Sequence, residues 1–390
     1  MNSKCFIKYF CYFIIAVITT SCSAKKSYKA GDGELIFSST SDISEDLRLS
    51  NIAVEEPSII ENTCWNVTDF DYQNSGISME SYEKIDADEY ISKFSKNGKY
   101  DFYSHPIICD GKVYDIDSGT AKISAYSLNN QKVKKLWSKN TLTFSERDNT
   151  VNSHARLEDD VLYIATTNGY VIAFDTKTQN VLWKKNYNKF FNASPTVYNN
   201  VIYLINSNDE VYAIDKNNGD IVWIFDEEKT SKTNSAQIPP VAVYQGKIVA
   251  GLSSGVVLVL NDKGGIVWKQ NVHSAKNDNE EITDIDFPPI LFNGILVAGG
   301  IRTSVMGFDF RTGTPLWQIK TGLNSYMLHN NQGFGFFVSK DNENICFVIS
   351  NGMIKWIKPQ EIADHTLVPG YFNEGQTDKI RYVSRYFDSY

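Results

Sequence analysis

Two acidic residues two positions apart form the most concentrated candidate chemistry in this sequence. Asp284 and Asp286 precede Pro288 in a segment with the pattern of an extended strand, and alternate residues of such a segment point to the same side. Two like charges held together on one side can select a basic partner and repel an acidic one. A solvated acidic loop without a partner is the alternative interpretation of these residues.

The sequence contains no recognisable catalytic pattern. The chain has five histidines: His105, His154, His273, His329 and His365. They lack the HExxH spacing of a zinc protease, and the chain has neither a GxSxG elbow nor a P-loop. His105 and His154 fall at equivalent places of neighbouring repeat units, but a metal needs more than two ligands. We expect a protein that is not an enzyme, with no catalytic residue, no metal and no cofactor.

Three cysteines lie in the body of the chain, at Cys64, Cys109 and Cys346. Three cysteines cannot all pair, and the sequence has no CxxC motif and no adjacent pair, so it indicates neither a disulfide framework nor a zinc site. Cys346 occupies a repeat position that otherwise holds alanine or glycine. That position favours a small core residue over a reactive thiol.

Residues 1–21 have the order of a secretory signal. Two lysines precede an apolar run over residues 9–18, and small polar residues follow up to Cys22. The apolar run is too short to cross a bilayer. The small residues before Cys22 resemble a bacterial lipobox, which predicts cleavage there and lipidation of Cys22; an ordinary secretory signal is the alternative. Residues 22–61, rich in Ser, Lys, Glu and Asp, are predicted to be a lipid-anchored tether with one short helical turn after Ser41.

The elements that must position the acidic pair belong to a repeat, which makes residues 62–390 one predicted domain. From residue 105 onward, runs of alternating polarity are separated by Asn, Asp and Gly pairs, a pattern typical of strands joined by tight hairpins. The units end in tryptophans 39 to 49 residues apart, which is the spacing of four-stranded propeller blades. We interpret these tryptophans as blade-to-blade packing residues: Trp137, Trp183, Trp223, Trp268, Trp317 and Trp356.

Three other positions of the unit carry structural predictions. A glycine four residues before the tryptophan suits a hairpin turn with positive φ. An aspartate eight residues before it can cap the amides of that turn, and the position ten residues before it takes a small side chain. The residues at these positions are Gly219, Gly264, Gly313 and Gly352; Asp175, Asp215 and Asp309; and Ala173, Ala213, Gly307 and Cys346. The segment 215–220 resembles a calcium loop but lacks the later glutamate, so we interpret it as this turn.

The spacing of these residues resembles the PQQ-type propeller repeat, because no tryptophan is followed by the aspartate of a WD40 unit. Within that superfamily the chain resembles the BamB family of lipoproteins of the outer-membrane β-barrel assembly machinery. The resemblance is carried by "FYSHPIICDGKVY" from Phe102, by "EITDIDFPPILFNGILVAGG" from Glu281 and by the lipobox-like start. It extends from Trp65 to Trp356.

The resemblance implies an all-β propeller of PQQ-like four-stranded blades. The propellers of that family have eight blades, whereas this chain shows six whole units. An N-terminal strand containing Trp65 could close a composite last blade, which predicts seven blades, with eight as the alternative. A short helix over residues 86–96, with Asp86 as its N-cap, is predicted as an insertion.

The resemblance also implies a function. It predicts a non-catalytic scaffold, lipid-anchored on the periplasmic face of the outer membrane, that binds the POTRA domains of the barrel-forming subunit BamA. It places partner contacts at Asp284 and Asp286, and a second contact loop near residues 230–235, where Lys232 is the only cation. A propeller that binds polysaccharide or peptidoglycan is the main alternative. A PQQ-dependent dehydrogenase is disfavoured because the chain lacks adjacent cysteines, and the net charge of −8 excludes nucleic acid as a partner.

Overall fold

The computed structural model describes residues 43–54, 64–65, 107–117, 120–129, 132–147, 152–226, 238–272, 284–325 and 327–359. Several predictions concern residues outside these ranges. They are the signal at 1–21, the lipidation site Cys22, the helix at 86–96, His105, His273, His365 and Lys232.

Six antiparallel sheets follow one another along the described part of the chain, each with its strands in sequence order. Sheet 1 contains β1 (Cys64–Trp65), β2 (Ile107–Cys109), β3 (Lys112–Ile116), β4 (Ile123–Asn129) and β5 (Lys132–Lys139). Sheet 2 contains β6 (Ser153–Glu158), β7 (Val161–Thr166), β8 (Tyr170–Asp175) and β9 (Asn180–Asn186). Sheet 3 contains β10 (Thr196–Tyr198), β11 (Val201–Ile205), β12 (Val211–Asp215) and β13 (Ile221–Phe225).

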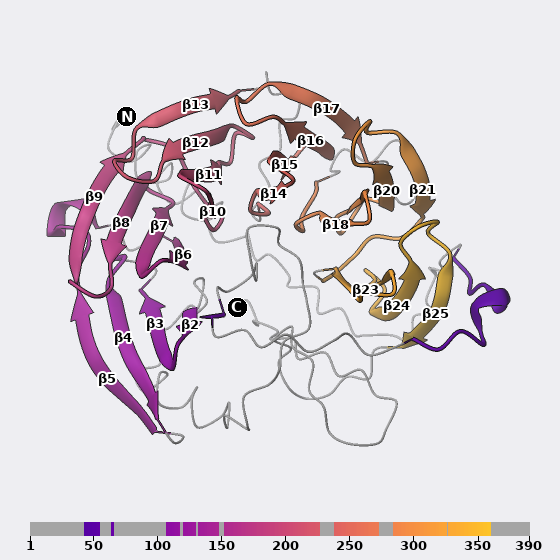
Figure 1. Ribbon diagram of the computed structural model, residues 1–390, viewed down its shortest axis with the longest axis horizontal. Coiled ribbons are helices and arrows are strands. Elements are labelled where there is room, and N and C mark those ends of the chain that lie inside the picture. The colour runs from indigo at the N-terminus through magenta and orange to yellow at the C-terminus, as the bar shows by residue number, and fades with distance from the viewer. Residues whose placement is uncertain are drawn as a thin grey trace, which may run out of the picture. The chain divides into compact units, whose positions relative to one another are not determined.

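The other three sheets have the same organisation. Sheet 4 contains β14 (Ala242–Tyr244), β15 (Lys247–Gly251), β16 (Val256–Leu260) and β17 (Ile266–Asn271). Sheet 5 contains β18 (Ile290–Phe292), β19 (Ile295–Ala298), β20 (Val305–Asp309) and β21 (Pro315–Ile319). Sheet 6 contains β22 (Leu328–His329), β23 (Phe334–Val338), β24 (Glu343–Val348) and β25 (Ile354–Pro359). In Figure 1 the fourth strand of sheets 2 to 6 lies at the rim, and the first strand of sheets 2 to 5 faces the middle.

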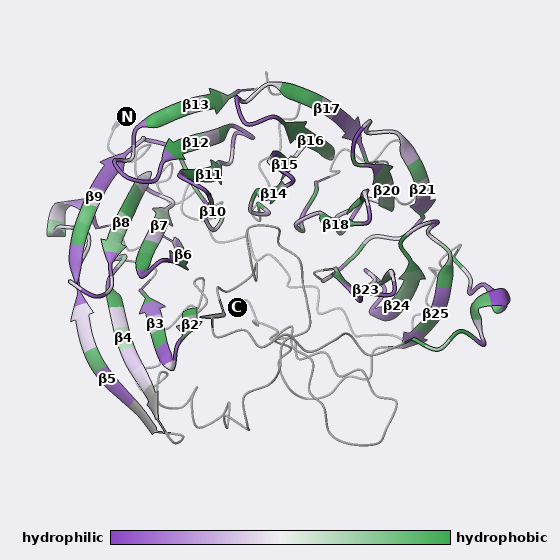
Figure 2. Cartoon of the chain, in the orientation of Figure 1, coloured by the Kyte–Doolittle hydropathy of each residue, from purple (hydrophilic) through white to green (hydrophobic). Residues whose placement is uncertain are grey.

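The hydrophobic core lies between neighbouring sheets. One cluster joins Tyr203 and Val211 of sheet 3 to Val243 and Ile248 of sheet 4. Because the middle strands are covered on both faces, they are continuous apolar runs such as "VIYLI" in β11 and "VVLVL" in β16. In Figure 2 the outer strand β13 is largely hydrophobic and β17 is hydrophobic at its start and hydrophilic at its end, although most side chains of both strands are exposed. The predicted all-β fold of four-stranded blades is confirmed.

Four tryptophans lie against the turn of the following sheet. The Trp183 indole Nε1 donates a hydrogen bond to the Lys216 carbonyl at 2.9 Å. Its ring covers Gly219, where a Cβ atom would lie 2.7 Å from the ring. The same two contacts join Trp223 to Asp262 and Gly264, Trp268 to Phe310 and Gly313, and Trp317 to Ile349 and Gly352. The four glycines have φ between 72° and 79°, which confirms the predicted positive-φ turns.

The other two repeat tryptophans have different surroundings. Trp137 of sheet 1 lies 5.8 Å, centroid to centroid, from Phe174 of sheet 2, and the next turn has Gln179 at φ 59° in place of glycine. Trp356 lies 6.3 Å from Phe336 within its own sheet. Tryptophan therefore contributes to the junctions between all five pairs of consecutive sheets.

A small residue faces most of the tryptophans across the last two strands. Ala213 is the register partner of Trp223, and the register shifts directly after it. The same bulge occurs opposite the tryptophan in all six sheets. A Cβ atom on Gly307 would lie 2.2 Å from the Trp317 ring, which explains why sheet 5 has glycine at this position. Sheet 4 is the exception, because Val259 faces Trp268 there.

The aspartates that end the third strand cap the turns, as predicted. Asp175 Oδ1 accepts hydrogen bonds from the Lys177 and Thr178 amides, both at 2.8 Å. Asp309 makes both equivalent bonds in sheet 5, and Asp215 accepts the first of them, from the Asn217 amide, in sheet 3. The segment 215–220 is therefore a hairpin turn, which agrees with its interpretation from the sequence.

The N-terminal segment 43–54 lies on the last sheet. The predicted helical turn is present as the 3₁₀ helix η1 (Leu47–Leu49), which Asp46 caps. The Asp46 amide donates to the Ile354 carbonyl at 2.8 Å, and the Ile357 amide donates to Glu45 Oε1 at 2.7 Å. Residues 43–54, assigned to the tether from the sequence, therefore cover the outer strand β25.

Strand β1 is in a different place from the one expected. The strand that contains Trp65 was expected in a composite last blade, but it pairs with β2 at the inner edge of sheet 1. The number of blades above six depends on residues outside the described ranges.

Candidate partner-binding site

The acidic pair lies where sheets 4 and 5 meet. Ile285 and Phe287 are buried, whereas Asp284 and Asp286 are only partly buried. This alternation places both carboxylates on the same side of an extended segment. The Ile285 amide donates to the Leu252 carbonyl of sheet 4 at 3.2 Å, and its side chain packs on Gly251. The segment is therefore fastened to sheet 4 before it enters β18.

A loop of sheet 5 holds the pair from the other side. Asp286 Oδ2 accepts a hydrogen bond from the Ile301 amide at 2.7 Å. Gly300 passes so close that a Cβ atom there would lie 2.1 Å from the Asp284 carbonyl oxygen. The Leu323 amide, which follows sheet 5, donates to the Gly300 carbonyl at 3.1 Å. The backbone that carries both residues, and the Asp286 carboxylate, consequently belong to a fixed structure.

The electrostatics of the pair follow from this packing. The pKa of Asp286 is raised to about 6, mainly by burial and also by the neighbouring Asp284 charge, although the Ile301 amide and Arg302 act in the opposite direction. A carboxylate that is partly buried beside a second one gains from a cation that approaches from outside. The site can therefore bind a basic group and can take up a proton near neutral pH.

The structure does not bring the candidate His154 to this pair. His154 lies in β6 of sheet 2, where its Nε2 is 3.1 Å from Asn192 Oδ1, and burial lowers its pKa. Asn192 lies in the segment that connects sheets 2 and 3, between β9 and β10, so this hydrogen bond holds that connection on β6. Among the described residues there is no cluster of three or more His, Cys, Asp or Glu side chains that could hold a metal.

Sequence reasoning missed the residues that support the acidic pair. Gly251, Gly300, Ile301 and Arg302 lie outside the repeat positions, and only the adjacent glycines at 299–300 were a signal in the sequence. Adjacent glycines permit a close approach of two backbone segments. They do not reveal which segment approaches.

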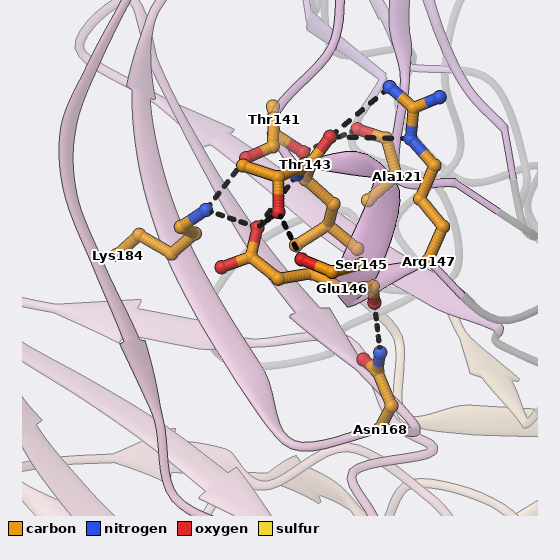
Figure 3. A network of polar contacts seen from close by, with 9 residues as sticks. Ala121, Thr141, Thr143, Ser145, Glu146, Arg147, Asn168 and Lys184 are labelled. Carbon is orange, nitrogen blue, oxygen red and sulfur yellow. Dashed lines mark hydrogen bonds and ion pairs between the residues drawn. The ribbon is translucent and has the colours of Figure 1, made fainter.

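A second polar cluster joins sheets 1 and 2 around the 3₁₀ helix η2 (Phe144–Glu146), as Figure 3 shows. Lys184 Nζ of β9 lies 2.7 Å from Glu146 Oε2, and Asn168 Nδ2 donates to the Glu146 carbonyl at 2.9 Å. The Thr143 amide also donates to the Glu146 carboxylate. The hydrogen bond from Lys184 is the main reason that the pKa of Glu146 falls to about 2. This cluster fastens two sheets together and presents no open group for chemistry.

The repeated sheets, the tryptophan-to-glycine contacts and the capped turns define a β-propeller of the PQQ-like class. No helix in the described ranges is both long and apolar enough to span a membrane. The chain belongs to the family described as "Outer membrane protein assembly factor BamB", whose model matches residues 110–358.

Curated relatives and a solved structure agree with this assignment. The chain is 30% identical over 270 residues to the outer membrane protein assembly factor BamB of Escherichia coli, with 67% of each chain covered. It is 30% identical over 273 residues to the factor of Salmonella typhimurium, again with 67% of each covered. The crystal structure of BamB from Moraxella catarrhalis superposes with a TM-score of 0.55 at 19% identity, covering 67% of this chain and 76% of the other. That superposition supports the fold.

Proposed function

We propose that this protein is a non-catalytic lipoprotein scaffold that assists the assembly of β-barrel proteins at the periplasmic face of the outer membrane. Membership of the BamB family carries the general role, since the relatives are named as outer membrane protein assembly factors. The finer proposal is that Asp284 and Asp286 bind a basic surface on the POTRA domains of a BamA-like subunit. Its main support is the fixed position of the Asp286 carboxylate and of the segment that carries both residues, between sheets 4 and 5.

The mechanism we propose depends on rigidity. Each of the six sheets except the last is fastened to the next through a tryptophan, and the turns that these tryptophans contact therefore keep fixed positions. A rigid ring of blades can hold a partner's domains in one orientation without a conformational change of its own. Lipidation of Cys22 would keep this body near the membrane and raise its local concentration there.

The direct experiment compares two double variants of equal charge. Asp284→Asn with Asp286→Asn removes both negative charges, yet an asparagine at 286 can still accept the Ile301 hydrogen bond. Asp262→Asn with Asp341→Asn makes the same charge change at exposed sites elsewhere. We expect the first variant to bind purified POTRA domains about tenfold more weakly or worse, and the second to bind as the unchanged protein does. Equal binding by both variants would refute the assignment of these carboxylates.

A further inference from the structure

Cys109, the last residue of β2, is disulfide-bonded. The interpretation from the sequence, that no disulfide is indicated, was therefore wrong for this residue. Sequence spacing could not reveal the bond, because it depends on which distant strand pairs with β2. The sulfur is largely shielded from solvent, since the residue is 7% exposed.

The strand register identifies the candidate partner. β1 runs antiparallel to β2, and Cys64 is the register partner of Cys109. Residues directly opposite in an antiparallel pair have Cα atoms roughly 4.5 to 5.5 Å apart, which lies within the range that a disulfide spans. We propose that Cys64 and Cys109 form a disulfide that fastens the N-terminal strand to the inner edge of sheet 1.

The third body cysteine does not compete for Cys109. Cys346 lies in β24 of sheet 6, is fully buried, and carries a free thiol. Burial raises its pKa to about 12, so it has almost no thiolate available for exchange. Cys346 occupies the small position opposite Trp356, which agrees with its interpretation as a core residue.

The oxidation has a simple balance. Two thiols lose two protons and two electrons, and the disulfide of a thiol–disulfide oxidoreductase accepts them and becomes two thiols. The reaction proceeds through a mixed disulfide with Cys64 or Cys109, which the other thiolate then displaces. The periplasm is an oxidising compartment in which such a disulfide can form. The inference rests on the proposed function only for this periplasmic location.

The disulfide would make the N-terminal segment a connection between sheet 6 and sheet 1. The segment 43–54 is held on β25 of sheet 6, where the Lys355 ammonium group donates to the Ser50 carbonyl at 3.1 Å. Ten residues further along the chain, β1 reaches β2 of sheet 1, and its pairing comprises only two residue pairs. So short a strand is held weakly by its backbone hydrogen bonds. A covalent bond at Cys64 would keep it in place.

Peptide mapping tests the pairing directly. Full-length protein expressed with export to the periplasm is alkylated, then digested with trypsin without reduction. The three body cysteines fall in separate peptides, residues 49–84, 100–112 and 341–355. We expect 49–84 to be linked to 100–112, and 341–355 to be alkylated only after denaturation. A link from 100–112 to any other peptide, or alkylated free thiols at both Cys64 and Cys109, would overturn the proposal.

Thermal unfolding gives a second test that does not depend on partner binding. The variant Cys64→Ser with Cys109→Ser is compared with Cys346→Ala, which places in sheet 6 the residue that sheets 1, 2 and 3 have at this position. We expect a reductant to lower the Tm of the unchanged protein and of Cys346→Ala by about 5 °C or more. The double serine variant should not respond. An equal response of all three proteins would contradict the disulfide, whatever the outcome of the POTRA experiment.

Discussion

The indole ring of Trp223 covers Gly264, the turn glycine of the following sheet, and a Cβ atom at that glycine would lie 2.9 Å from two ring atoms. Gly264 also has φ 79°. The sequence therefore needs glycine here for two reasons, the backbone conformation and the room for the ring.

We expect Gly264→Ala to lower the free energy of unfolding by about 2 to 4 kcal/mol, since positive φ and overpacking each cost roughly 1 to 3 kcal/mol. Gly246→Ala is the matched control, because Gly246 has φ 74° but nothing within 4 Å of its Cβ position. Urea denaturation of both variants separates the two costs. Equal destabilisation would show that the tryptophan contact contributes nothing at this junction.

Glu146→Gln is expected to weaken the junction of sheets 1 and 2 at neutral pH. Folding lowers the pKa of Glu146 from 4.5 to about 2. The stabilisation is therefore complete above about pH 4.5 and is lost as the pH falls towards 2. Because the ion pair with Lys184 is partly exposed, we expect a loss of about 1 kcal/mol at pH 7 and a smaller one at pH 3.

The control for Glu146→Gln is Asp220→Asn, which breaks the more exposed ion pair with Lys185. That variant should change the free energy of unfolding by less than about 0.5 kcal/mol. Urea denaturation at pH 7 and pH 3 makes the comparison. A loss at Glu146 that does not diminish at pH 3 would contradict the role of its charge.

Asp286→Asn is expected to stabilise the protein above pH 6. Folding raises the pKa of Asp286 from 3.8 to about 6, so the folded state disfavours the carboxylate. The destabilisation is absent below about pH 3.8 and complete above about pH 6. Partial solvent screening reduces it to about 1 kcal/mol. Thermal unfolding between pH 4 and pH 7.5 should therefore show a flatter profile for the variant.

Asp115 titrates in the same range, since burial and the nearby charge of Asp117 raise its pKa to about 6 as well. Asp115→Asn should remove a separate part of the pH dependence, and the double variant should remove both. If Asp286→Asn leaves the slope between pH 4 and pH 6 unchanged, its carboxylate is more solvated than this packing indicates.

The repeat made much of this fold predictable from sequence. The turn glycines and the capping aspartates follow from local chemistry, because φ and a short acceptor side chain act within a few residues. The contacts between neighbouring sheets were harder to predict from the sequence. The sequence indicated that Trp183 packs between blades, but the bond from its indole to the Lys216 carbonyl depends on how two whole sheets meet.

Contacts between distant residues explain what the sequence did not reveal. The acidic pair was visible as a motif, whereas the hydrogen bond from Ile301 to Asp286 joins residues 15 apart across a sheet. No local pattern in the sequence marks Cys109 as disulfide-bonded, because the strand that pairs with β2 lies far upstream. The segment 43–54 has the composition of a tether, and its contacts with β25 and with the core of sheet 6 join it to residues that are distant in the sequence.

The position of segment 43–54 on β25 determines when this segment can fold relative to the synthesis of the chain. Lys355 and Ser50 are 305 residues apart, so the N-terminal segment must wait until almost the entire polypeptide has been made. At roughly 5 to 20 residues per second, that delay is on the order of 15 to 60 s. Segment 43–54 is synthesised early and is thus among the last parts to reach its native position. A product truncated before β25 would lack the strand that this segment binds.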